Sequence, residues 1–123
     1  MKNFNELDIA KAYQGKPYIA TKLRKIAIGS GNTRAVVYNY RITKSQGALI
    51  GITDEIFYKW CDDGIYFGVF IDLDEASGTI SHCCINKTKG THGEDGKFHH
   101  IPLSPTQQDL EIFQNVMNFI TNE

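Results

Sequence analysis

The run IYFGVFIDL at residues 65–73 alternates strongly apolar side chains with a second set that includes a glycine and an aspartate. Successive side chains of a strand point to opposite faces, so this period of two predicts a strand with one buried face. EASG at 75–78 is typical of a hairpin turn and predicts that residues 79–86 return as the antiparallel partner. Tyr66 and Phe70 fall on the outward face, which leaves open whether that face meets solvent or a second subunit.

Three further strands are predicted around this hairpin. Residues 18–28 and 33–42 are rich in β-branched and aromatic residues, and they enclose the turn-forming sequence GSGN at 29–32. Residues 97–103 form the last predicted strand, directly before a helix.

Capping residues and apolar spacing predict three helices. The C-terminal helix, residues 105–121, begins with Ser104 as the N-cap and Gln107 completing a capping box. Its apolar residues recur at helical spacing and form one stripe that packs on the core. A shorter helix opens the chain and ends before Gly15. Residues 53–63 are interpreted as a short helix, although their aromatic run also suits a strand.

Together these elements predict an α+β fold that forms a single domain over residues 1–123. We expect an antiparallel sheet of about five strands, with an N-terminal helix and a C-terminal amphipathic helix packed on it. The chain is 41% hydrophobic and 22% charged, and its 123 residues suffice for one buried core. Fibrous, disordered and membrane-spanning classes do not fit these figures.

The charge is divided along the chain. Residues 1–45 hold nine basic and two acidic side chains, a net of +7, and the remaining 78 hold four basic and twelve acidic ones, a net of -8. The sum is the overall charge of -1. This pattern indicates an anionic partner for the first third, or two segments that neutralise each other after folding. The acidic remainder argues against an extended nucleic acid as partner.

A basic patch is predicted from strand register. If GSGN at 29–32 closes a four-residue loop, Arg24 lies opposite Val37 in the next strand. The resulting cluster on the outward face, and the predicted ligand-binding set, is Lys22, Arg24, Asn39 and Arg41. Guanidinium groups form paired hydrogen bonds with oxyanions, so the cluster suits a phosphate, a nucleotide, a nucleic-acid backbone or an acidic protein surface. Internal carboxylates that can neutralise it are Asp72 and Asp74.

The stretch between the last two strands is predicted to be a long exposed loop. Residues 86–97 contain no large apolar side chain. Long connections in compact domains often carry function, so we expect this loop to contact a partner. The predicted partner-binding residues are Lys89, His92, Glu94 and Asp95.

Three of the four histidines fall within residues 92–100. Pairing of the strands that flank the predicted loop brings His82 close to His100. Imidazole, thiolate and carboxylate groups bind zinc, which makes a metal-assisted hydrolase one functional hypothesis. Its candidate residues are His82, His92, Asp95, His99 and His100. The spacing matches no standard zinc motif, however, and we predict no metal ligand, no cofactor and no catalytic residue.

The N-terminal residues and the cysteines indicate the cellular compartment that the sequence predicts. MKNFNELD at 1–8 has neither an apolar core nor a cleavage site, so no signal peptide is predicted. No apolar run is long enough to cross a bilayer. The cysteines are odd in number, and the adjacent pair Cys83 and Cys84 can bond only with backbone strain. Buried free thiols in a cytoplasmic protein are the prediction.

The leading functional hypothesis is a small cytoplasmic, non-enzymatic binding protein that recognises a macromolecular partner, with a protein as the expected partner. An inhibitor or immunity-type protein of phage or mobile-element origin fits this pattern. The alternative is a module that binds a small anionic ligand such as a nucleotide through the basic patch. Neither a membrane nor an extended nucleic acid is expected as a partner.

Overall fold

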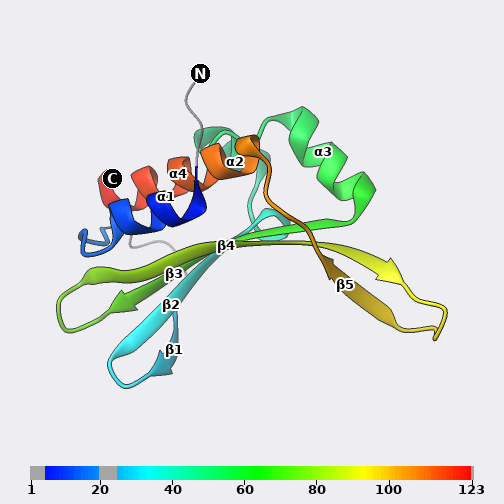
Figure 1. Ribbon diagram of the computed structural model, residues 1–123. Coiled ribbons are helices and arrows are strands. Elements are labelled where there is room, and N and C mark those ends of the chain that lie inside the picture. The colour runs from blue at the N-terminus through cyan, green and yellow to red at the C-terminus, as the bar shows by residue number, and fades with distance from the viewer. Residues whose placement is uncertain (1–4, 20–24, 123) are drawn as a thin grey trace.

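Five antiparallel strands form one curled sheet in the order β1-β2-β3-β4-β5, and four helices lie on one of its faces (Figure 1). This computed structural model describes residues 5–19 and 25–122, apart from the side chains of 25–27. The strands are β1 Lys25–Gly29, β2 Asn32–Tyr38, β3 Ile65–Asp74, β4 Thr79–His92 and β5 Phe98–Pro102. The helices are α1 Glu6–Tyr13, α2 Lys44–Leu49, α3 Asp54–Asp63 and α4 Gln107–Asn122, and Asn39–Arg41 form the 3-10 turn η1. The predicted α+β class, five-stranded sheet and two terminal helices are confirmed.

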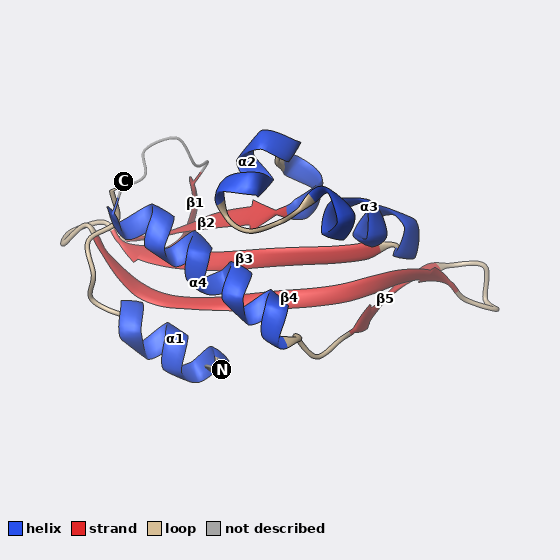
Figure 2. Cartoon of the chain, turned by 90° about the horizontal axis from the view of Figure 1, so that it is seen from above, coloured by secondary structure: helices blue, strands red, loops and turns tan. Residues whose placement is uncertain are grey.

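The core lies between the helices and one face of the sheet. The odd-numbered positions of β3, from Ile65 to Leu73, are all buried, as the period of two predicts. Trp60 of α3 stacks on Phe67 with ring centroids 5.0 Å apart. α4 lies across the middle of the sheet with α1 beside it (Figure 2). The residues that α4 buries recur at helical spacing: Asp109, Leu110, Ile112, Phe113, Val116, Met117 and Ile120.

The opposite face of the sheet is not covered by any element in the described part of the chain (Figure 1). We call it the open face. Register places on it the even-numbered positions of β2, β3 and β5, and those of β4 from His82 onward. Tyr66 and Phe70 lie on this face as predicted.

The first hairpin differs from its predicted register. Gly29 pairs with Asn32, so a two-residue loop closes it in place of the predicted four-residue loop. Gly31 has a φ of 72°, which glycine adopts without a steric penalty in such a tight loop. A bulge before Gly29 then shifts the pairing by one residue relative to the prediction. β2 ends at Tyr38, and Asn39 and Arg41 therefore do not lie in a strand.

The predicted loop at 86–97 is wrong. β4 continues to His92, pairing first with β3 and then with β5, and only residues 93–97 connect it to β5. Main-chain hydrogen bonds hold this end of β4, to β3 as far as Lys89 and to β5 from Thr88 onward, so it needs few apolar side chains. His82 lies opposite Asp72 and His100 opposite Gly90, which also overturns the predicted proximity of the two histidines.

The three predicted helices are present, one of them shifted, whereas α2 was not predicted. α3 begins after the N-cap Thr53 and ends at Gly64, and α1 ends before Gly15. α4 begins two residues later than predicted. Thr106 Oγ1 accepts a hydrogen bond from the backbone N–H of Asp109 over 3.1 Å, and Asp109 Oδ2 accepts one from the backbone N–H of Thr106 over 2.8 Å. The capping box therefore consists of Thr106 and Asp109, in place of the predicted Ser104 and Gln107. No helix in the described ranges is long and apolar enough to span a membrane.

Candidate functional site: the open-face pocket

A cavity of about 430 Å³ lies on the open face where η1, β3, β4 and β5 meet. Three tyrosines, a histidine, an arginine and two uncharged polar residues line it. The lining residues are Tyr38, Tyr40, Arg41, Tyr66, Asn86, Thr88 and His100. Ligand pockets of proteins are commonly of this size, with aromatic walls and a few polar groups. We call this cavity the open-face pocket.

Asn39 positions the two η1 residues of the pocket. Its Nδ2 donates to the carbonyl of Ile65 over 2.9 Å, and its Oδ1 accepts from the backbone N–H of Phe67 over 3.1 Å. The buried carboxamide thus takes the place of a strand partner beside the start of β3. Because the chain leaves the sheet here, Tyr40 and Arg41 come to lie against the open face.

Aromatic contacts hold the pocket walls together. The ring centroids of Tyr40 and Tyr66 lie 4.7 Å apart, and those of Tyr66 and His100 lie 4.9 Å apart. The Arg41 guanidinium stands over the Tyr38 ring, 5.7 Å from its centroid. A cation over a ring gains electrostatic attraction while its N–H groups stay available to an anion.

The polar groups of the pocket are free of side-chain partners within the described part of the chain. None of the seven lining side chains forms a hydrogen bond or ion pair with another described residue, and no carboxylate is among them. Partial burial raises the pKa of the Tyr40 phenol, which therefore keeps its proton and its capacity to donate at neutral pH. The pocket offers an unpaired positive charge, hydroxyl and amide groups, and flat apolar surfaces in one place.

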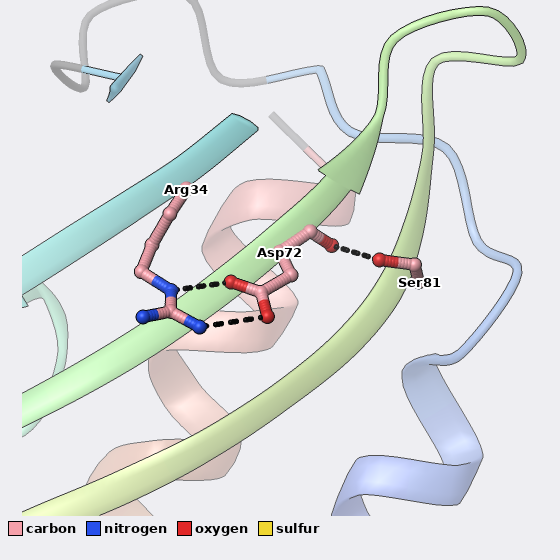
Figure 3. A network of polar contacts seen from close by, with 3 residues as sticks. All are labelled: Arg34, Asp72 and Ser81. Atoms are coloured by element: carbon pink, nitrogen blue, oxygen red, sulfur yellow. Dashed lines mark hydrogen bonds and ion pairs between the residues drawn. The ribbon is translucent and has the colours of Figure 1, made fainter. Parts of the chain in front are cut away.

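A second arginine on the open face is already neutralised. Arg34 Nε donates to Asp72 Oδ1 over 2.6 Å and Nη2 to Oδ2 over 3.1 Å, as Figure 3 shows. This hydrogen bonding raises the pKa of Arg34. Ser81 Oγ donates to the backbone carbonyl of Asp72 over 3.1 Å, fixing that residue against β4. Asp72 is thus the partner of Arg34, and Arg41 forms no ion pair with any carboxylate that the structure describes.

The predicted ligand-binding set is only partly brought together. Arg41 lines the open-face pocket, whereas Asn39 is buried and bonded to the backbone, so its assignment as a ligand contact is corrected. Lys22 and Arg24 lie outside the described residues. The sequence reasoning missed most of the pocket, although the outward position of Tyr66 was a usable signal. The missed lining residues are Tyr38, Tyr40, Tyr66, Asn86, Thr88 and His100.

The predicted partner-binding residues lie along the β4–β5 hairpin. Lys89 faces the helix side of the sheet, since it pairs with Ile65, and His92 faces the open side. Asp95 accepts from the backbone N–H of Lys97 over 2.9 Å and lies 3.0 Å from His99 Nε2. The hydrogen bond with His99 lowers the pKa of Asp95. Glu94 is exposed in the connection beside it.

The hydrolase hypothesis loses the geometry on which it depended. Among the residues that the structure describes, no group of three or more histidine, cysteine, aspartate or glutamate side chains is placed to hold a metal. His99 is turned to the opposite side of β5 from His100, with Asp95 as its contact. The three thiols are free, and Cys61 is exposed, contrary to the prediction that all are buried.

Comparisons with known proteins do not assign a family. No protein-family model matches the chain, and no curated protein or solved structure matches it significantly. The function is therefore inferred from the geometry of the open-face pocket.

Proposed function

We propose that the protein is a non-enzymatic binding protein that holds a small anionic ligand with a planar ring, of the nucleotide class, in the open-face pocket. The observation that carries the proposal is the unpaired guanidinium of Arg41 beside the rings of Tyr38, Tyr40 and Tyr66, in a lining without carboxylates. A phosphate supplies the charge that Arg41 lacks, and a base supplies a flat partner for the rings.

The unused polar groups support the same ligand class. The side-chain amide of Asn86 and the hydroxyl of Thr88 project from neighbouring positions on the open face of β4. Such groups recognise the edge of a base or the hydroxyls of a sugar. The pocket has one imidazole and neither a thiol nor a carboxylate beside it, an arrangement that favours binding over acid–base catalysis.

Titration calorimetry with the four ribonucleoside 5′-monophosphates tests the proposal. At least one is expected to bind with a dissociation constant below about 1 mM, while inorganic phosphate and the matching nucleoside bind more weakly. Arg41→Gln is expected to weaken binding at least about tenfold, because it removes a charge-assisted contact worth about 1.5–3 kcal/mol.

Lys59→Gln is the matched control. It also removes one positive charge, but Lys59 lies on α3 in the helix layer and is 75% exposed, with only Asp63 at 3.6 Å. Its affinity for the same monophosphate should stay within about twofold of the unchanged protein. Absence of binding by all four monophosphates, or equal loss in both variants, rejects the proposal.

A second candidate function is recognition of a protein through the exposed edge of β5. Every residue of β5 is exposed, and this strand is the last in the sheet. Unpaired main-chain groups of an edge strand can accept a strand from a partner. A photo-crosslinker at position Ile101 tests this candidate function. Saturable cross-linking to a single protein of the source cell supports it, whereas cross-linking of many proteins in proportion to their abundance rejects it.

A further inference from the structure

A chain of aromatic rings begins in the open-face pocket and continues beyond it along the β4–β5 hairpin. The ring centroids lie 4.7 Å apart for Tyr40 and Tyr66, 4.9 Å for Tyr66 and His100, 5.1 Å for His100 and Phe98, and 5.2 Å for Phe98 and His92. We call these five residues the ring ladder. Phe98 and His92 are not part of the pocket lining, so the aromatic surface is longer than the pocket.

Gly90 makes the ring ladder continuous. Tyr66 belongs to β3 and His100 to β5, and β4 runs between these two strands. Their rings meet over β4 because Gly90, which pairs with His100, has no side chain there. A Cβ at Gly90 would collide with the Phe98 ring and lie 3.1 Å from the Tyr66 ring. A side chain at this position would therefore separate the pocket rings from the hairpin rings.

The exposed rings leave faces available to a ligand. Phe98 is 48% exposed, although it is a large apolar side chain. The three contacts from Tyr66 to His92 are edge-to-face, with interplanar angles of 76°, 84° and 69°. In an edge-to-face contact the edge of one ring covers one face of the other ring only, so these three contacts leave several ring faces for stacking.

The positive charge at the pocket end of the ring ladder favours an anionic ligand. Arg41 stands at the pocket end of the ladder without a carboxylate partner. His92 and His100 form no ion pair with any described carboxylate, whereas the neighbouring His99 is held by Asp95 on the other side of the strand.

We propose that the open face binds a short single strand of nucleic acid, with one nucleotide in the open-face pocket and the following bases stacked along the ring ladder. This inference rests on the proposed function and extends it from a mononucleotide to an oligonucleotide. Unpaired bases present flat faces to rings, whereas the bases of a duplex are already stacked on one another. An acidic peptide supplies charge without flat rings, and it fits the ladder less well.

Fluorescence anisotropy with labelled pentanucleotides, and competition by the monophosphate that binds best, tests the inference. RNA and DNA pentanucleotides of mixed sequence serve as separate arms. The better pentanucleotide is expected to bind at least about tenfold more tightly than the monophosphate, because each stacked base contributes about 1–3 kcal/mol. The same sequence as a duplex, and a pentaglutamate peptide, should compete at least about tenfold more weakly.

Phe98→Ala is the decisive variant, and Ile101→Ala is its matched control. Both residues lie in β5 and both are 48% exposed, but Ile101 pairs with Lys89 on the opposite side of the sheet. Phe98→Ala is expected to weaken the pentanucleotide about tenfold and to leave the monophosphate unchanged, while Ile101→Ala affects neither. Phe98→Leu keeps the apolar contact without the ring and should behave like Phe98→Ala, which separates stacking from folding.

The outcomes distinguish the two proposals. The single-strand inference is overturned, and the nucleotide pocket stands, in either of two cases. In the first, the monophosphate binds but the pentanucleotide binds no more tightly. In the second, Phe98→Ala does not change the affinity for the pentanucleotide. A duplex or pentaglutamate that competes as well as the single strand also overturns it. If neither the monophosphate nor the pentanucleotide binds, both proposals fall.

Discussion

The carboxamide of Asn39 connects the stability of the fold to the shape of the open-face pocket. It satisfies the Ile65 carbonyl and the Phe67 N–H at the buried start of β3, and it directs the chain into η1. Asn39→Ala leaves both backbone groups unpaired, so we expect the free energy of unfolding to fall by about 2–3 kcal/mol. Urea denaturation measures this change, and calorimetry should show weaker monophosphate binding because Arg41 loses its support.

Asn86→Ala provides the contrast for that prediction. The Asn86 amide lines the same pocket but has no hydrogen-bond partner among the described residues. Its removal is expected to change stability by less than about 0.5 kcal/mol while still weakening the ligand. Equal destabilisation by the two variants would contradict the role given to Asn39.

The three thiols should differ widely in reactivity. Burial raises the pKa of the Cys83 thiol to about 12, and burial also raises the pKa of Cys84, whereas Cys61 is exposed. The thiolate is the reactive form, so iodoacetamide is expected to modify Cys61 first and Cys83 only after unfolding. Mass spectrometry of timed digests checks the order. Rapid modification of Cys83 in the folded protein would show that β4 opens more readily than its burial implies.

At this scale the sequence identifies residue types better than residue roles. Arg41, which strand register assigned to a basic patch, lies in the lining of the open-face pocket, and its role as an anion contact stays a prediction. Asn39 is chosen for the same site, yet its side-chain amide is hydrogen-bonded to backbone groups 26 and 28 residues further along the chain. A long-range contact of this kind depends on where β2 ends, which a local pattern does not specify.

Among the elements, α4 and β4 are joined by a buried ion pair. Lys87 Nζ lies 2.7 Å from Asp109 Oδ2, with the two side chains only 11% and 4% exposed. Asp109→Asn keeps the capping oxygen but leaves the Lys87 charge buried alone, so we expect a loss of about 3 kcal/mol. Adding Lys87→Met should restore part of that stability, as measured by urea denaturation in a double-mutant cycle.

The exposed pair on α3 is the control for this cycle. Lys59→Met removes an ion pair whose lysine is largely in water, and the expected loss is below about 0.5 kcal/mol. Additive effects of the Lys87 and Asp109 changes, without any rescue in the double variant, would show that the buried pair does not couple β4 to α4.

Elements with a strong local signal are well predicted, and those fixed by pairing are not. The alternation of β3 and the apolar stripe of α4 identify both elements. α1 is also predicted, but its buried face is not evident from the sequence. The helix buries Ile9 and Tyr13 and leaves Leu7 69% exposed, because its contacts with β4 and α4 determine which face is buried. The outer half of β4 reads as a loop, since its hydrogen-bonded neighbours are not visible in a local pattern.

For the whole molecule, the near-neutral charge has a consequence for binding. The overall charge is -1, and Arg41 is the unpaired cation in the open-face pocket lining. With about one or two phosphates neutralised, the logarithm of the pentanucleotide association constant should fall with a slope of about -1 against the logarithm of salt concentration. Anisotropy over a range of potassium chloride concentrations measures the slope. A slope steeper than about -3 would require several more cations at the phosphates than the pocket supplies.

Among the described residues, one ion pair joins the basic first third of the sequence to the acidic remainder. Of the ion pairs formed by described residues, Arg34–Asp72 joins the basic first third to the acidic remainder, and the Lys59 and Lys87 pairs lie within the acidic part. Composition and periodicity suffice to predict the α+β class and a single sheet. They do not place the charges, because register determines which side chains become neighbours.

The stacking of Trp60 on Phe67 separates two optical signals on either side of β3. Trp60 is the sole tryptophan and is buried in the core, whereas Tyr66, the neighbour of Phe67, faces the pocket. Indole emission should therefore follow unfolding and stay nearly constant when a nucleotide binds. Tyrosine emission excited at shorter wavelength should respond to the ligand. One unlabelled sample thus carries separate spectroscopic reporters of folding and of occupancy.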